Sequence, residues 1–150
     1  MERDETRRTP VEGVEPSSTT GRTADASAVW TIIVGGGSGR RFGRPKQYEL
    51  LNERRVIDVS HDVAAACTDG VVLVVPEADA EREGGVAGGA TRSESVRAGL
   101  AHVPESVGVI CVHDAARPLA SVDVYRRVVA AVVGGADAAI PAVALADTVK

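Results

Sequence analysis

Residues 29–46 read VWTIIVGGGSGRRFGRPK, an apolar run that leads directly into a loop rich in glycine and arginine. The apolar part, residues 29–34, has the length and β-branched content of a buried parallel strand. Glycines placed directly after such a strand allow backbone N–H groups to approach phosphate oxygens closely. Arg40, Arg41, Arg44 and Lys46 add positive charge to the loop, with no acid among them. The stretch therefore predicts a nucleoside triphosphate site.

Two common phosphate-binding patterns do not fit this loop. A dinucleotide-binding GxGxxG counted from Gly37 and Gly39 needs a third glycine where Phe42 stands, and the G-K-S or G-K-T of a P-loop is missing. The structural alternative is a tight turn between a strand and a helix. Because cations gathered in a turn would repel one another without an anion, we favour phosphate binding.

The rest of the chain alternates predicted strands and helices. Apolar runs predict strands at 71–75, 107–112 and 137–143, and helical spacing of apolar residues predicts a helix over 56–67. A capping box beginning at Thr91 predicts a helix to about residue 102, and Ser121 can cap another that ends near residue 133. This order predicts an α/β fold, a mostly parallel sheet with helices on both faces. Ligands of such sheets bind beyond the carboxyl ends of the strands, so the loops there should form one site.

Composition limits the classes of function. The chain has 150 residues, which suits one domain, and 44% of them are hydrophobic without a run of membrane-spanning length. A net charge of −4 and only 3% aromatic residues argue against a nucleic-acid surface. We therefore expect neither nucleic acid nor a membrane as a partner, and a cytoplasmic location. Residues 1–28 are polar and lack hydrophobic periodicity, which predicts a disordered tail.

Two later loops carry groups suited to a nucleotide. Residues 113–118 read HDAARP after a predicted strand, where Asp114 is a natural Mg²⁺ ligand; the alternative is that it caps the turn and pairs with Arg117. Residues 88–95 read GGATRSES, in which Gly89 and Ser95 offer a close backbone approach and a hydroxyl at a helix start. The alternative there is an ordinary capped helix.

Together the motifs resemble a known family. In order they are GGGSGRR followed by PKQY, then GGxxRxxSVxxGL, then HDAARP and then DTVK. Over residues 29–150 they resemble the 2-C-methyl-D-erythritol 4-phosphate cytidylyltransferases of the non-mevalonate isoprenoid pathway. The resemblance implies a Rossmann-like nucleotidyltransferase fold and a homodimer. It also implies the Mg²⁺-dependent transfer of CMP from CTP to 2-C-methyl-D-erythritol 4-phosphate, a polyol phosphate, with release of pyrophosphate.

The resemblance assigns roles to particular residues. They are catalytic Arg41 and Lys46; nucleotide-binding Gly35, Gly36, Gly37, Gly39, Gly89 and Ser95; metal-binding Asp114 with Arg117 in support; and Asp147, Thr148 and Lys150 in the segment that reaches the partner subunit's substrate site.

The sequence also departs from the family's pattern. Val34 to Gly37 stand where the family usually has Pro-Ala-Ala-Gly, and Ala90 replaces an acidic residue. The family's pattern continues beyond Lys150, so we expect residues 29–150 to be the N-terminal part of a C-terminally truncated cytidylyltransferase domain. The alternatives are a pentitol- or sugar-phosphate cytidylyltransferase and a non-catalytic nucleotide-binding module. The failed GxGxxG pattern disfavours a dinucleotide-dependent dehydrogenase.

Overall fold

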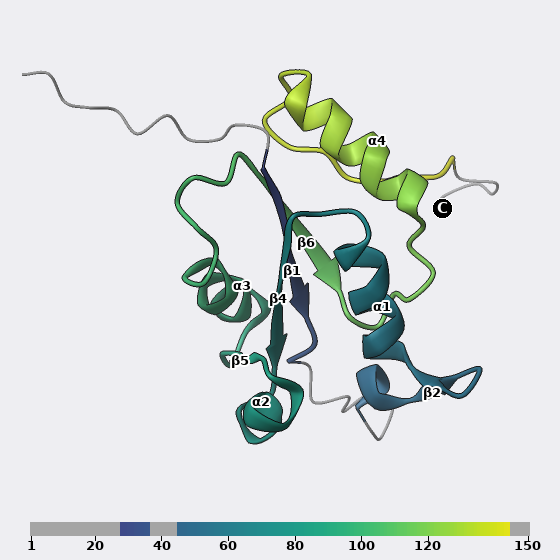
Figure 1. Cartoon of the computed structure of the whole chain (residues 1–150), viewed down its shortest axis with the longest axis vertical. Coiled ribbons are helices and arrows are strands. Elements are labelled where there is room, and N and C mark those ends of the chain that lie inside the picture. Colours follow the sequence, from purple (N-terminus) through teal and green to yellow (C-terminus); the bar gives the residue numbers. More distant parts are fainter. Residues whose placement is uncertain (1–27, 37–44, 145–150) are drawn as a thin grey trace, which may run out of the picture.

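The structure, a computed structural model, describes residues 28–36 and 45–144. Its main sheet has four strands, all parallel, in the order β5-β4-β1-β6 (Figure 1). The strands are β1 (Val29–Val34), β4 (Gly70–Val75), β5 (Val86–Ala87) and β6 (Val109–Asp114). The predicted parallel sheet is confirmed.

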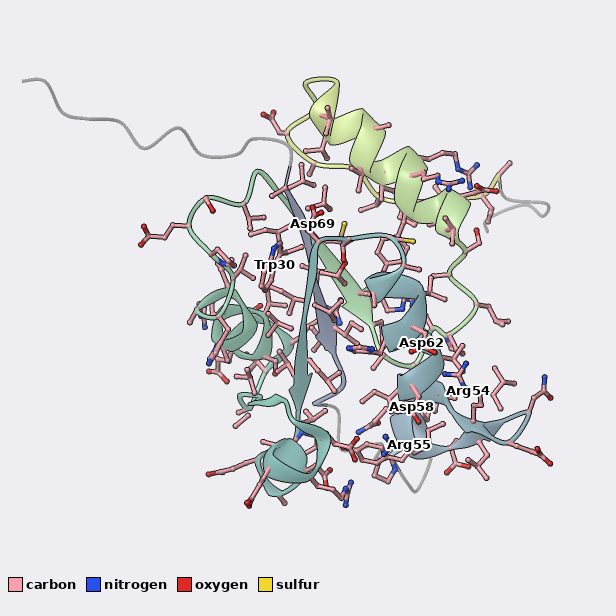
Figure 2. The ribbon with its side chains drawn as sticks, viewed as in Figure 1. Trp30, Arg54, Arg55, Asp58, Asp62 and Asp69 are labelled. Atoms are coloured by element: carbon pink, nitrogen blue, oxygen red, sulfur yellow. The ribbon has the colours of Figure 1, made fainter. Side chains whose placement is uncertain are left out.

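Strand β1 lies in the middle of the sheet because its apolar residues can be buried on both faces. Ile32 and Ile33 are fully buried and point to opposite faces, as neighbours on a strand do. The register places Trp30 beside Gly70 of β4, and the Trp30 ring covers that glycine (Figure 2). Asp69, next to Gly70, accepts a hydrogen bond from the Val29 N–H at 2.8 Å and so closes the amino-terminal end of this pair.

Helices cover both faces of the sheet, as predicted. Helices α1 (Val56–Ala65) and α4 (Val122–Val133) lie on one face, and α3 (Arg92–Leu100) lies on the other (Figure 1). The first face holds a core around Ile33, Ile57, Ala64, Val75 and Tyr125. The second holds Ile32, Val34, Val72 and Val74, with Val96 of α3 packed against them.

The chain reverses its direction of travel across the sheet beside β1. From β1 it passes through α1 to β4, and then through α2 (Glu77–Glu83) to β5 at one edge. Helix α3 then carries it back across the other face to β6, on the far side of β1. The carboxyl ends of β1 and β6 therefore flank a topological switch point, the place where open α/β sheets bind ligands.

Two helix starts follow the predicted capping chemistry. Thr91 Oγ1 accepts a hydrogen bond from the Glu94 N–H at 3.1 Å, and Glu94 Oε2 accepts one from the Thr91 N–H at 2.9 Å, which completes the capping box of α3. Ser121 Oγ accepts from the Val124 N–H at 3.4 Å at the start of α4. These side chains satisfy backbone donors that the first helical turn leaves unpaired.

A small hairpin between β1 and α1 is an element that the sequence analysis missed. Strands β2 (Leu50–Leu51) and β3 (Arg54–Arg55) are antiparallel and are joined by Asn52 and Glu53, both with positive φ. Two positive φ values at a two-residue loop match the twist of a hairpin. A glutamate is an unusual residue for that conformation, so the sequence carried no turn signal here.

The predicted strand over 137–143 is wrong. Residues 137–144 form no strand, and Ile140 and Val143 are 85% and 90% exposed. Pro141 has no N–H to donate to a ladder, and little apolar burial rewards pairing. A hollow of about 870 Å³ separates this segment from β6 and α4. Strand β6 therefore stays at the edge of the sheet.

The predicted disordered tail, residues 1–28, lies outside the described residues except for Ala28. Among residues 28–36 and 45–144, no helix has the length and apolar character needed to cross a membrane.

Candidate functional site

The loops after β1 and β6 meet at the carboxyl edge of the sheet. Val34, the last residue of β1, pairs in register with Asp114, the last residue of β6. The next residue, Gly35, donates its N–H to the Val74 carbonyl at 2.7 Å. A Cβ on Gly35 would lie 3.3 Å from the Ala115 Cβ and 3.4 Å from the Val74 oxygen. Gly35 therefore allows the glycine loop to leave the sheet through a space too narrow for a larger side chain.

One buried hydroxyl organises the second loop of the site. Ser95 Oγ accepts a hydrogen bond from the Gly89 N–H at 3.2 Å and donates to the Thr91 carbonyl at 3.0 Å, while its side chain is nearly inaccessible to solvent. A Cβ added to Gly88 would come within 2.9 Å of this oxygen, and one added to Gly36 within 3.4 Å. The structure thus brings together four of the predicted nucleotide-binding residues, namely Gly35, Gly36, Gly89 and Ser95.

Asp114 occupies the end of β6 on the same edge. Its Oδ1 accepts a hydrogen bond from the Ala116 N–H at 3.1 Å, and its Oδ2 lies 3.7 Å from Arg117 Nε. These are the contacts of the structural alternative, in which Asp114 closes the turn and pairs with Arg117. Both side chains remain accessible, with 39% of Asp114 and 79% of Arg117 exposed. The carboxylate keeps unused lone pairs that a cation could share.

His113 holds this turn in place, a role that the sequence analysis missed. The Arg117 carbonyl lies 3.2 Å from His113 Nε2, and a carbonyl can only accept, so Nε2 carries the proton. The Tyr125 hydroxyl then donates to Nδ1 at 2.9 Å, and the two rings stack 5.7 Å apart. Burial lowers the pKa of His113, which favours this neutral form. The alternation of Cys111 and His113 along β6 was the available signal, because it directs both toward one face.

Lys46 begins the short 3-10 helix η1 (Lys46–Tyr48) and is exposed. The remaining predicted site residues lie outside the described residues; they are Arg41, Gly37, Gly39, Asp147, Thr148 and Lys150. Across residues 28–36 and 45–144, no three His, Cys, Asp or Glu side chains are grouped to hold a metal ion.

Comparison with known proteins assigns the chain to a family. The sequence model of the 2-C-methyl-D-erythritol 4-phosphate cytidylyltransferases matches residues 29–150. The chain belongs to this family. The resemblance inferred from the four motifs is confirmed.

Curated relatives of the chain include both separate and fused enzymes. A bifunctional IspD/IspF enzyme of Anaeromyxobacter dehalogenans is 45% identical over 134 residues, which make up 79% of this chain and 33% of that protein. A 2-C-methyl-D-erythritol 4-phosphate cytidylyltransferase of Streptomyces avermitilis is 36% identical over 154 residues, 90% of this chain and 59% of that protein. The chain thus spans between one third and three fifths of these two relatives.

Solved structures share the fold. The 4-diphosphocytidyl-2C-methyl-D-erythritol synthase of Anaerococcus prevotii has a TM-score of 0.61 and 24% identity, over 73% of this chain and 52% of that one. A manganese complex of Rv0371c from Mycobacterium tuberculosis has a TM-score of 0.54 and 17% identity, over 69% and 59% of the two chains. The fold is therefore that of the nucleotidyltransferases, as the sequence resemblance implied.

Proposed function

We propose that this chain carries the CTP-binding part of an enzyme that transfers CMP from CTP to 2-C-methyl-D-erythritol 4-phosphate and releases pyrophosphate. The observation that carries the proposal is the grouping of Gly35, Gly36, Gly89, Ser95 and Asp114 at the switch point of a chain in this family. The proposal includes a cytoplasmic location and residues 29–150 as the N-terminal part of the catalytic domain.

The chemistry needs little from a protein base. An oxygen of the acceptor's phosphate attacks the α-phosphorus of CTP, the bond from that phosphorus to the bridging oxygen breaks, and pyrophosphate leaves with the electron pair. Because the attacking phosphate is already an anion, no proton has to be removed from it. Catalysis then consists of positioning the two substrates and balancing negative charge, as in phosphoryl transfer generally.

Each group has a role that follows from its type. Backbone N–H groups of the glycine loop after Gly35, whose own N–H is bonded to the Val74 carbonyl, would meet the phosphate oxygens. Arg41 and Lys46 would stabilise the charge that develops around the α-phosphorus, as cationic groups do in transition states of this kind. The loop organised by Ser95, with Gly89, would contact cytosine and ribose through main-chain groups. Neither substrate binding nor turnover would involve a nucleic acid or a membrane.

Asp114 fits the metal that the reaction uses. Mg²⁺ prefers one or two carboxylates together with phosphate oxygens, and Asp114 offers one accessible carboxylate at the edge where the triphosphate would lie. When bound, the ion neutralises charge on the phosphates. Arg117, 3.7 Å from the same carboxylate, would keep it oriented. Mg²⁺ rather than Mn²⁺ is part of the proposal.

The last residues of the chain belong to the acceptor side of the proposal. Asp147, Thr148 and Lys150 match the segment that in the family reaches the substrate site of the partner subunit, so we include a homodimer and a shared acceptor site. Their roles are tested by whether their substitution changes acceptor use without changing CTP binding.

The test begins with binding by the 150-residue protein. We expect CTP with Mg²⁺ to raise the unfolding midpoint and ATP to leave it unchanged; ligand at a hundred times its Kd adds about 2.7 kcal/mol to the folded state. Lys46→Ala should abolish most of this shift. Arg126→Ala, which removes an exposed cation on the outer side of α4, is the matched control. A midpoint that CTP leaves unchanged would contradict the proposal.

Product analysis separates the acceptor alternatives. Incubation with CTP, Mg²⁺ and either 2-C-methyl-D-erythritol 4-phosphate or a pentitol phosphate should yield the CDP-alcohol and pyrophosphate with the first acceptor only. Preference for the pentitol phosphate would establish the sugar-alcohol alternative. Binding of CTP without either product would establish a nucleotide-binding module instead.

A further inference from the structure

The Tyr48 side chain connects the turn that carries Lys46 to helix α2. The Tyr48 hydroxyl donates a hydrogen bond to Asp79 Oδ2 at 2.8 Å, across 31 positions of sequence. Helix α2 directly follows β4, whose Val74 carbonyl accepts the Gly35 N–H. The anchoring point of Tyr48 is therefore fixed at the same edge of the sheet as the glycine loop.

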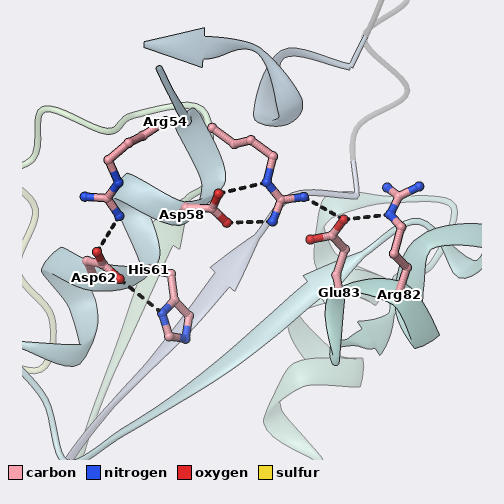
Figure 3. Close-up of polar contacts among 7 residues, drawn as sticks. Arg54, Asp58, His61, Asp62, Arg82 and Glu83 are labelled. Atoms are coloured by element: carbon pink, nitrogen blue, oxygen red, sulfur yellow. Dashed lines mark hydrogen bonds and ion pairs between the residues drawn. The ribbon is translucent and has the colours of Figure 1, made fainter. Parts of the chain in front are cut away.

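The Tyr48 ring also lies close to two cations. The guanidinium carbon of Arg82 lies 5.2 Å from the ring centroid, and that of Arg55 lies 6.0 Å from it. Glu83, whose side chain is only 4% exposed, joins these two arginines by accepting from Arg55 Nη1 and Arg82 Nε, both at 2.9 Å (Figure 3). We call Tyr48, Arg55, Asp79, Arg82 and Glu83 the Tyr48 cluster.

The Tyr48 cluster is closed by further ion pairs. Arg82 Nη2 lies 3.0 Å from Asp79 Oδ1, so the carboxylate that holds the tyrosine is itself held. Arg55 also binds both oxygens of Asp58 on α1, at 2.8 and 2.7 Å, which gives the bidentate geometry that fixes a guanidinium in one orientation (Figure 3). The cluster thus joins η1, β3 and α2, and Asp58 connects it to α1.

The Tyr48 hydroxyl keeps its proton, so its hydrogen bond to Asp79 does not depend on pH in the neutral range. Burial, followed by the hydrogen bond to Asp79, raises the pKa of Tyr48 to about 12. The hydroxyl therefore stays protonated and can donate throughout the neutral range. Tyr48 ends the turn that Lys46 begins, and its side chain also packs against the core that holds Ile33 and Ala115.

We propose that Tyr48 is a positioning residue for Lys46: its bond to Asp79 and its contacts with Arg55 and Arg82 fix the Lys46–Tyr48 turn so that the ammonium group meets the triphosphate. This inference rests on the proposed function. A long, flexible lysine loses conformational freedom when it binds an anion, and a backbone fixed beforehand lowers that loss. A small displacement of such a group weakens phosphate binding.

The first measurement needs no nucleotide. The backbone N–H groups of Tyr48 and Glu49 donate within η1, to Pro45 and Lys46 at 3.3 and 3.2 Å, and their hydrogen exchange reports on the turn. We expect Tyr48→Phe to speed their exchange about tenfold. Thr68→Val is the matched control, because it removes a hydroxyl bonded at 3.0 Å to the Ala64 carbonyl at the opposite end of the sheet.

The second measurement is a double-mutant cycle on the binding of CTP with Mg²⁺. Tyr48→Phe should weaken binding about tenfold when Lys46 is present, which is the scale of a small misplacement, and should have no effect when Lys46 is alanine. Asp79→Ala, which removes the acceptor of the same hydrogen bond, should reproduce this result if Tyr48→Phe folds poorly.

The outcomes separate the two proposals. Faster exchange at residues 48 and 49, with a loss of affinity that depends on Lys46, supports the positioning role. Unchanged exchange, or an equal loss of affinity in both backgrounds, overturns it and leaves Tyr48 as a stabilising residue only. Failure of the unmodified protein to bind CTP refutes the proposed function, and the inference falls with it.

Discussion

Ser95→Ala tests the site at the residue that organises it. The substitution removes a hydroxyl that accepts from the Gly89 N–H at 3.2 Å and donates to the Thr91 carbonyl at 3.0 Å. Each such bond contributes about 0.5–1.5 kcal/mol net. Alanine returns up to about 0.5 kcal/mol through its higher helix propensity. We therefore expect the free energy of unfolding to fall by about 1–2 kcal/mol, or several degrees in the unfolding midpoint.

The same change should weaken nucleotide binding, because the Gly88–Thr91 loop loses its internal support. The assay is denaturant unfolding with and without CTP and Mg²⁺, which yields stability and affinity from one set of curves. Ser93→Ala, on the exposed side of the same helical turn, is the control and should stay within about 0.5 kcal/mol of the unmodified protein. If Ser95→Ala matched Ser93→Ala in both stability and affinity, the role assigned to the buried hydroxyl would be refuted.

Three further substitutions follow from packing and charge. Gly99→Ala places a Cβ 2.6 Å from Ile32 Cγ2. The overpacking should cost about 1–3 kcal/mol and outweigh the gain of about 1 kcal/mol in helix propensity, so the unfolding midpoint should fall. An unchanged midpoint would contradict this. The hydrogen bond from Arg55 lowers the pKa of Glu83, so the contribution of Glu83 to stability is present above pH 4.5 and is lost as the pH falls below that value. In Glu83→Gln the free energy of unfolding should therefore fall less steeply with decreasing pH. Equal slopes for the two proteins would argue against this role of Glu83. Burial lowers the pKa of His113, so the contribution of His113 to stability is present above pH 6.5 and declines as the pH falls from there. In His113→Gln this decline should be missing from a plot of unfolding free energy against pH. A curve parallel to that of the unmodified protein would show that His113 titrates normally.

Long apolar runs were the most reliable sequence signal. Strand β1 has the predicted bounds, because it is central in the sheet and four of its six residues are buried. Strand β6 is shifted toward the carboxyl end, to Val109–Asp114, since His113 and Asp114 continue the ladder beside β1. Hydrogen bonding to a neighbouring strand, which hydropathy does not encode, set that boundary.

The elements that were missed lack an apolar pattern. Helix α2 reads EADAERE and buries none of its residues, so helical periodicity could not reveal it. The run at 137–143 was wrongly predicted as a strand: it is apolar, but it has no hydrogen-bonded neighbour in the described sheet. Apolar character predicts burial only where tertiary structure supplies a surface to cover it.

The candidate site was predictable in outline because topology alone brings the ends of parallel strands together. Gly35, Ser95 and Asp114 were expected near one another on that ground, and the structure places them there. The support of the site was not predictable. The Tyr48–Asp79 bond and the His113–Tyr125 pair join residues that are distant in sequence, and residue type alone does not reveal such partners.

The central place of β1 also shapes how this protein folds. Strand β1 is synthesised before every other described element, yet both of its partners, β4 and β6, emerge from the ribosome much later. Its most buried segment, Thr31 to Val34, must wait with unpaired backbone groups and apolar side chains until those partners exist. Sheets that depend on such distant pairings form slowly and expose segments prone to aggregation on the way. The strand order that creates the switch point therefore also leaves β1 unpaired until β4 and β6 have been synthesised.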